Sequence, residues 1–166
     1  MPHIVPGRVT FDHDGDVVVF LIGMRFNRFR SVRHWWPVFT AMPKMLRELS
    51  VDPSIGMLGF SGALQGLRSP TIIQYWRDVD SLLAYAKATD REHHPAWAAF
   101  NRAVRDSRGA VGIWHETYVV PRGGFEAVYV DMPAHGLGKA FGTVEAGGRR
   151  ATAAGRLGRE GGAAAG

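Results

Sequence analysis

An almost continuously apolar run lies near the N-terminus of the chain, DVVVFLIGMRF at residues 16–26. β-Branched and aromatic residues dominate this run, and it is too short for a favoured helix, so it predicts a β-strand. Successive side chains of a strand point to opposite faces. Both alternating sets are apolar here, so both faces need burial. Helices can cover one face, and something else must cover the other.

The rest of the chain alternates helical and strand patterns. Apolar residues after Ser31 recur at spacings of three and four, which predicts a helix that ends at Asp52. Residues 55–64 and 69–77 predict two strands joined through 65–67. Helical patterns follow up to Lys87 and again from Pro95. Residues 111–120 predict another strand, and residues 125–133 predict a short strand that forms a hairpin with it.

This order of elements predicts the α+β class with a ferredoxin-like β-α-β-β-α-β fold. The sheet is expected to be antiparallel, with both helices on one side and an extra C-terminal hairpin strand. No helix remains for the second apolar face of the first strand. The simplest cover is the sheet of a second copy, so we expect a homodimer.

Length and composition set the expected boundaries. The 166 residues suit one domain, with 46% apolar residues and 21% charged residues. We expect an N-terminal extension at 1–14, the ferredoxin-like domain at 15–142 and an ordered loop at 134–142. Residues 143–166 are mostly Gly and Ala without periodicity, which predicts a disordered tail.

Composition also excludes several classes of function. The chain has no Cys, so disulfides, thiolate metal sites, Fe–S clusters and cysteine nucleophiles are excluded, and a cytoplasmic location is expected. No signal peptide and no apolar segment of membrane-spanning length is present. The basic stretch Arg25–His34 interleaves arginines with aromatic residues, which could bind nucleic acid. Arginines between a strand and a helix are more often solvated or paired with carboxylates, so no nucleic-acid partner is expected. No membrane partner is expected either, because no segment is long and apolar enough to span a bilayer.

Several segments resemble a known family when they are taken together. They are FLIGMRFN, WWPVF, QYWRDVDSLLAYA, HHPAWAAFNR, GIWHETY and YVDMPAHGLGKA, which begin at Phe20, Trp35, Gln74, His93, Gly112 and Tyr129. On these segments, from about Gly15 to Lys139, the chain resembles the dimeric α/β-barrel monooxygenase superfamily. It is similar in particular to the monooxygenase family that includes the fungal enzyme of fumagillin biosynthesis.

The resemblance implies a dimeric α/β barrel and a monooxygenase, an oxidoreductase of secondary metabolism. The same fold hosts cofactor-free oxygenases, haem enzymes and binding proteins, so the chemistry is less constrained than the fold. No catalytic residue can be transferred from the family to this chain. Candidate residues must therefore come from the sequence itself.

The strand at 111–120 carries the most informative polar residues. Alternation places His115 on the face of Val111 and Ile113, and places Glu116 on the opposite face. A cofactor-free oxygenase needs a base that removes a proton from a phenol or enol, so that the resulting anion can reduce O₂. A histidine in an apolar pocket titrates near neutral pH and suits this role. His115 is the first candidate base, Glu116 replaces it if the pocket lies on the other face, and a structural histidine is the alternative.

Other candidates are weaker. His94 precedes the helix at Pro95 and could carry a proton, ligate haem or cap the helix. Arg25 and Asn27 close the first strand, where they could orient a substrate oxygen or be solvated. His34, Trp36, Trp114 and Tyr118 are candidate walls of a substrate pocket, or core residues. No histidine spacing predicts a metal site, and no nucleotide-binding or hydrolase motif occurs.

The sequence thus leads to a small oxygenase without cofactor that acts with O₂ on an apolar aromatic or polyene metabolite, in a pocket between sheet and helices. One alternative is a haem enzyme of the same fold, with His94 or His115 as the axial ligand. The other alternative is a dimeric, non-catalytic protein that binds a hydrophobic ligand.

Overall fold

A computed structural model describes residues 3–87 and 95–159, with side chains in the second range described from Ala98 onward. The long apolar run forms β2, a central strand of the larger of two sheets. The strands are β1 (Ile4–Thr10), β2 (Val17–Phe26), β3 (Met57–Gln65), β4 (Ser69–Trp76), β5 (Val111–Val120), β6 (Tyr129–Pro133) and β7 (Val144–Glu145). The α-helices are α1 (Val32–Val51), α2 (Val79–Lys87), α3 (Pro95–Asp106), α4 (Gly136–Phe141) and α5 (Ala153–Arg156), with short 3-10 helices at Pro53–Ile55, Gly66–Arg68 and Gly148–Ala151.

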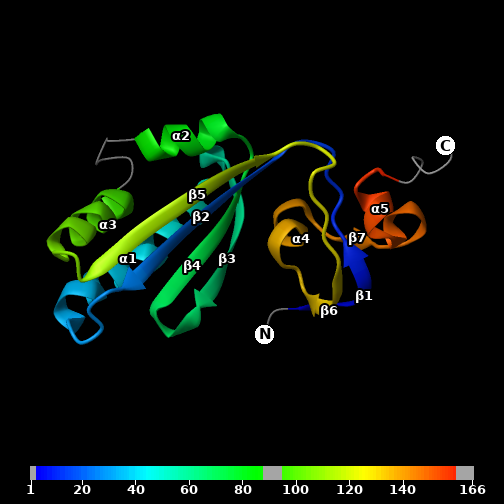
Figure 1. Cartoon of the computed structure of the whole chain (residues 1–166). Helices are drawn as coiled ribbons and strands as arrows, with labels where there is room; N and C mark the ends of the chain where they lie inside the picture. Colours follow the sequence, from blue (N-terminus) through cyan, green and yellow to red (C-terminus); the bar gives the residue numbers. More distant parts are fainter. Residues whose placement is uncertain (1–2, 88–94, 160–166) are drawn as a thin grey trace, which may run out of the picture.

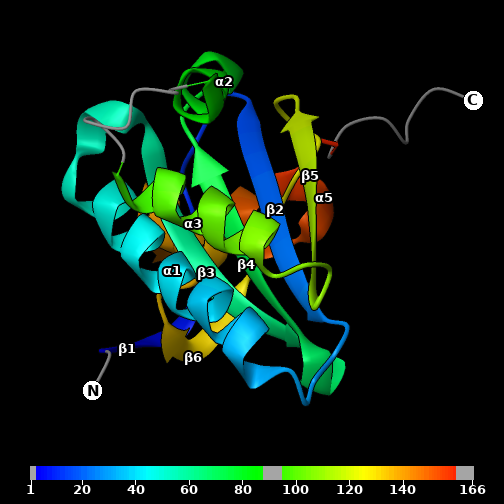
Figure 2. The same ribbon diagram turned by 90° about the vertical axis from the view of Figure 1, so that its left-hand side faces the viewer.

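The larger sheet is antiparallel and has the strand order β3-β4-β2-β5. The helices α1, α2 and α3 lie on one side of it, which we call the helix face (Figures 1 and 2). Val18, Met24 and Phe26 of β2 point to this face and join Val38 and Met42 of α1 in the hydrophobic core. This part of the chain confirms the predicted α+β class and the β-α-β-β-α-β order.

Helix α1 follows the predicted apolar stripe. Met42, Leu46 and Leu49 are buried, whereas Phe39 stays partly exposed. Ser31 occupies the N-cap position without a side-chain hydrogen bond to the helix. The helix ends before Asp52, whose carboxylate accepts a hydrogen bond from the Ser54 amide.

The N-terminal residues differ from the expected extension, because β1 belongs to a second, three-stranded sheet with the order β6-β1-β7. Pro6 and Gly7 interrupt the strand pattern in the sequence, and the β1–β6 register shifts between Val5 and Arg8 around them. Gly7 has a φ of 79°, and its amide donates a hydrogen bond to Asp131. The strand was therefore not recognisable from alternation, because a bulge at Pro6 and Gly7 breaks its two-residue period.

The C-terminal strand also pairs differently from the prediction. Tyr129–Pro133 was expected to form a hairpin with the strand at 111–120, but β6 pairs antiparallel with β1. The chain turns at Gly124, whose amide bonds to the carbonyl of Pro121, and then leaves the larger sheet. The edge of β5 opposite β2 consequently has no strand partner within the described residues.

The side of the larger sheet turned away from α1–α3, the open face, is partly covered by the same chain (Figure 1). The segment 136–141, expected to be a loop, forms α4 and packs against β3. A Cβ atom at Gly59 would lie 3.6 Å from the Ala140 Cα atom, so β3 and α4 are in van der Waals contact. The cover that the sequence assigned wholly to a second copy is thus supplied in part by α4.

The predicted disordered tail is ordered as far as Arg159. β7 extends the second sheet, and the Thr152 side chain caps the short α5. The Arg156 guanidinium is nearly buried and forms an ion pair with Glu126 at 2.7 Å. Composition alone does not predict that this segment is ordered, because one buried arginine, rather than an apolar stripe, anchors it. None of the helices among the described residues combines the length and the apolar character needed to cross a membrane.

Candidate functional site

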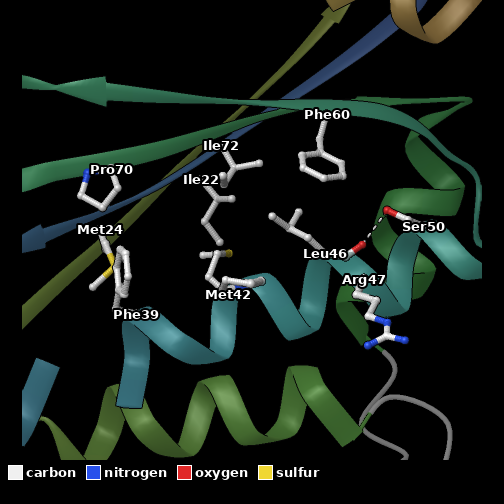
Figure 3. Close-up of a pocket in the computed structure, with 11 residues that line it drawn as sticks. Ile22, Met24, Phe39, Met42, Leu46, Arg47, Ser50, Phe60, Pro70 and Ile72 are labelled. Carbon is white, nitrogen blue, oxygen red and sulfur yellow. Dashed lines mark hydrogen bonds between the residues drawn. The ribbon is translucent and has the colours of Figure 1, made fainter. Parts of the chain in front are cut away.

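The strongest candidate site is an apolar cavity of about 400 Å³ between α1 and the helix face of the larger sheet, here called the α1 cavity (Figure 3). Its position agrees with the predicted pocket between sheet and helices. The residues that line it come from β2, α1, β3 and β4. They are Ile22, Met24, Phe39, Met42, Pro43, Leu46, Arg47, Ser50, Phe60, Pro70 and Ile72.

Two periodicities build this lining. On α1, Phe39, Pro43, Leu46 and Ser50 follow each other at spacings of three and four, so they lie along one side of the helix. On the strands, alternate residues such as Ile22 and Met24 point to the helix face. The cavity lies where this side of α1 stands above the edge of the sheet formed by β4 and β3.

The lining is suited to an apolar ligand. Phe39 and Phe60 supply aromatic rings, and Met24 and Met42 supply polarisable thioethers that adapt to irregular shapes. Ser50 and Arg47 are the polar residues of the lining, and they lie together at one end (Figure 3). The Ser50 hydroxyl donates a hydrogen bond to the carbonyl of Leu46, and the Arg47 guanidinium points away from the sheet. None of the described residues that line the cavity is a histidine, aspartate, glutamate or tyrosine.

His115 lies on the helix face, as its alternation with Val111 and Ile113 predicts. It pairs across the strands with Ile22, and its ring centroid is 5.6 Å from that of Phe20. The side chain is exposed, and it is separated from the α1 cavity by the width of β2. Ile22 both lines the cavity and pairs with His115, so it lies between the imidazole and the cavity.

Glu116, Trp114 and Tyr118 lie on the open face, on the side of the sheet opposite the α1 cavity, and Glu116 is thus opposite His115 as strand alternation predicts. The Tyr118 hydroxyl donates a hydrogen bond of 2.5 Å to the Glu116 carboxylate. This hydrogen bond, and then the carboxylate charge, raise the pKa of Tyr118 above its ordinary value. The Trp114 indole lies over Gly23, because a Cβ atom at Gly23 would be 2.3 Å from that ring.

The remaining candidates are dispersed. Arg25 is exposed at the end of β2, and the Asn27 side-chain amide donates to the carbonyl of Gly109 at 3.4 Å. Trp36 is 52% exposed on α1. His34 occupies the first turn of α1, where its Nδ1 atom is buried without a hydrogen-bond partner among the described residues. His94 lies outside the described residues.

The spacing of Phe39, Met42 and Leu46 predicts one helical stripe, but it does not predict a cavity beside them. The empty volume beside them arises because α1 covers β4 and β3 incompletely, which no local pattern reveals. None of the predicted site residues that the structure describes lines the α1 cavity.

Within the described part of the chain no group of three His, Cys, Asp or Glu side chains is placed to hold a metal ion. Among the described residues that line the cavity none is a histidine: His115 stands on the far side of Ile22, and His94, the other candidate axial ligand, lies outside the described residues.

Comparison with known proteins places these features in context. The sequence model of the monooxygenase af470-like family matches residues 17–137. Monooxygenase af470 of Aspergillus fumigatus is 30% identical over 132 residues, which cover 75% of this chain and 46% of that protein. The chain therefore spans less than half the length of this curated relative.

Two solved structures resemble the fold. Aldoxime dehydratase OxdRE, in complex with butyraldoxime, has a TM-score of 0.59 at 14% identity. The superposition covers 85% of this chain and 42% of the OxdRE chain. Another aldoxime dehydratase has a TM-score of 0.58 at 19% identity, and the superposition covers 88% of this chain and 45% of the dehydratase chain. At these identities the likeness concerns the fold alone.

Proposed function

Because the chain belongs to the monooxygenase af470-like family, we propose that it is a cofactor-independent oxygenase that takes an apolar aromatic or polyene metabolite into the α1 cavity. The observation that carries this proposal is the apolar lining of about 400 Å³, a volume within the usual range for small-molecule sites. The rings of Phe39 and Phe60 and the thioethers of Met24 and Met42 would contact a flat, electron-rich ligand.

The reaction needs no external reductant if the substrate supplies the electrons. A CH₂ group between two aromatic rings loses a proton to a base, and the resulting carbanion or enolate reduces O₂. The organic radical and the reduced oxygen then combine to a peroxide, which loses water and leaves C=O. Overall, the CH₂ compound and O₂ give the carbonyl compound and H₂O, so the carbon is oxidised and both oxygen atoms are accounted for.

His115 remains the proposed base on the helix face. A substrate in the α1 cavity would have to extend past Ile22 to present its acidic proton to the imidazole. The apolar body of the substrate would be held by the cavity, and the proton would leave towards the exposed edge of the sheet. Glu116 is the proposed base only for a substrate on the open face.

A second candidate function follows from the same lining. Because none of the described residues that line the cavity carries a carboxylate or an imidazole, a non-catalytic protein that binds a hydrophobic ligand there is also consistent with the geometry. The two functions share the site but differ in O₂ consumption.

The site can be tested with two neighbouring residues of β4. Ile72 lines the cavity, and Ile73 points to the open face. With anthrone as the probe, Ile72→Phe should weaken binding, measured by tryptophan quenching, by about tenfold or more because the larger side chain occupies part of the volume. Ile73→Phe should bind anthrone like the wild type. Equal affinities of all three proteins would place the ligand elsewhere.

Catalysis is tested on the same proteins by O₂ uptake with anthrone. If His115 is the base, His115→Ala should lower turnover per folded protein by roughly 10²–10⁴-fold without a lower melting temperature. Glu116→Gln is the matched control and should turn over normally. Binding without O₂ uptake would support the binding protein, and a Soret band in the purified wild type would support the haem enzyme.

A further inference from the structure

Two long parts of the sequence contain no acidic residue. Neither Asp nor Glu occurs from Val17 to Arg47 or from Pro53 to Arg77, whereas the first segment holds five arginines and the second holds two. The first segment includes the loop before α1 and most of α1, and the second includes the β3–β4 connection. Any surface made from both segments is therefore positively charged.

The fold brings these two segments together. The loop before α1 and the β3–β4 connection lie side by side at one end of the molecule, at the bottom of both ribbon views (Figures 1 and 2). The Arg68 guanidinium lies 5.9 Å from the centre of the Phe29 ring, in a cation–π contact between the two segments. This contact joins residues that are far apart in the sequence.

Large apolar side chains project from this end into solvent. Phe29 is 50% exposed, Trp36 is 52% exposed and Leu67 is 88% exposed. Val32, one helical turn before Trp36, is also 50% exposed. Scattered exposed apolar residues are ordinary, but a group on adjoining segments indicates an interaction surface.

Four arginines belong to the same two segments, next to Phe29, Val32 and Leu67 in the sequence. Arg28, Arg30, Arg33 and Arg68 are all exposed, and none forms an ion pair with a described residue. We call the four apolar residues Phe29, Val32, Trp36 and Leu67, together with these four arginines, the arginine–aromatic patch. Phe39 and Pro70 of the α1 cavity lie at one end of that cavity and belong to the same two segments as the patch (Figure 3).

We propose that the arginine–aromatic patch docks the protein on an anionic lipid surface, with its aromatic and aliphatic side chains in the interface and its arginines on the headgroups. Aromatic side chains prefer the headgroup level of a bilayer, and basic residues near anionic lipids add to the attraction. The docking does not depend on the oxygenase activity. It would place one end of the α1 cavity near the lipid phase, where apolar metabolites accumulate.

The composition of the patch favours lipid over other partners. A second copy would place arginines against arginines in a symmetric contact, which like-charge repulsion opposes. Single-stranded nucleic acid prefers stacked aromatic residues, whereas Val32 and Leu67 offer no ring for stacking. The sequence had led us to expect no membrane partner, but that expectation considered membrane-spanning segments and not a surface assembled by the fold.

Vesicle flotation with the full chain tests the proposal. Wild type should float with vesicles of phosphatidylcholine and phosphatidylglycerol, and much less with phosphatidylcholine alone or in high salt. The triple variant Arg30→Gln/Arg33→Gln/Arg68→Gln should bind the anionic vesicles at least about tenfold more weakly. The control variant Arg122→Gln/Arg149→Gln/Arg159→Gln has the same net charge as the first triple variant but an intact patch, and it should bind like the wild type.

A second pair of variants tests the apolar part of the patch. Trp36→Ser/Leu67→Ser removes two exposed side chains and should weaken vesicle binding, whereas Leu83→Ser on α2, 44% exposed, should not. Melting temperatures establish that all variants are folded. Equal binding by both triple variants, or no wild-type flotation, would overturn the proposal. So would high-affinity binding of a single-stranded oligonucleotide that depends on the patch while anionic vesicles are not bound.

Discussion

At the residue scale, one glycine determines where a tryptophan lies. Gly23 and Trp114 are paired across β2 and β5, and the indole occupies the space that a Cβ atom at Gly23 would need. Gly23 is buried although it is on the open face. The tryptophan therefore covers the central strand at a position where any larger residue would displace it.

We expect Gly23→Ala to lower the free energy of unfolding by about 1–3 kcal/mol, because the added methyl group would lie 2.3 Å from the indole. The same substitution should be less destabilising in a Trp114→Ala background, where the ring is absent. Gly62→Ala on β3 is the control, because the nearest atom to its Cβ would be 3.9 Å away. Chemical denaturation of the four variants measures the coupling, and additive effects at Gly23 and Trp114 would contradict it.

Also at the residue scale, the Tyr118–Glu116 hydrogen bond has a consequence for titration. Ionisation of the phenol would break this hydrogen bond and place two negative charges together, which is why the pKa of Tyr118 is raised. In Glu116→Gln the apparent pKa of one tyrosine should fall towards the ordinary value near 10. Ultraviolet titration of the phenol absorbance measures this change, with Tyr118→Phe identifying the residue. A titration curve identical in wild type and Glu116→Gln would exclude the hydrogen bond in solution.

At the scale of elements, the C-terminal segment is held by Arg156 rather than by an apolar stripe. Its guanidinium is bonded to Glu126 and to the carbonyls of Arg150 and Ala151. With 6% of the side chain exposed, it is a nearly buried charge whose donors are satisfied by these partners. The ion pair thereby holds the C-terminal segment against the loop that precedes β6, to which Glu126 belongs.

We expect Glu126→Ala to destabilise the protein by about 3–5 kcal/mol, because it leaves the Arg156 charge nearly buried without its carboxylate. Asp12→Ala removes the partner of Arg150 in an exposed ion pair and should change stability by less than about 1 kcal/mol. Truncation after Gly142 should likewise lower the melting temperature, contrary to the expectation for a disordered tail. Thermal melts of the three proteins measure these effects, and a truncated protein as stable as the full chain would show that α5 contributes nothing.

At the scale of the whole molecule, the open face remains only partly covered. α4 packs over β3, but Val19, Leu21 and Ile73 are still partly exposed on that face, and Tyr118 is 49% exposed beside them. A half-covered apolar sheet face favours association with a second copy. The arginine–aromatic patch lies at a different place, so a dimer through the open face and docking through the patch are compatible.

We predict a homodimer, with a sedimentation mass of about twice 18.2 kDa at micromolar concentration. Leu21→Lys on the open face should shift the equilibrium to the monomer, because it would bury a charge in the interface. Leu83→Lys on α2 should leave the dimer intact. A monomeric wild type would contradict the prediction, and circular dichroism of Leu21→Lys distinguishes dissociation from unfolding.

The order of the main elements and the faces of their strands follow from local patterns in the sequence. The 3.6-residue and two-residue periods are local properties, so α1, the β3–β4 hairpin and β5 were predictable from the spacing of apolar residues. The opposite orientations of His115 and Glu116 followed from alternation alone. The family resemblance was likewise readable in short segments, and the family match confirms it.

Which distant segments meet depends on the folded chain and not on local patterns. The pairing of β1 with β6 depends on a bulge at Pro6 and Gly7, and the order of residues 144–159 depends on Arg156 reaching Glu126. The α1 cavity exists because a helix and a sheet edge leave volume between them, and volume has no local pattern in a sequence. The same reason applies to the arginine–aromatic patch, because Arg68 and Phe29 become neighbours only when the chain has folded.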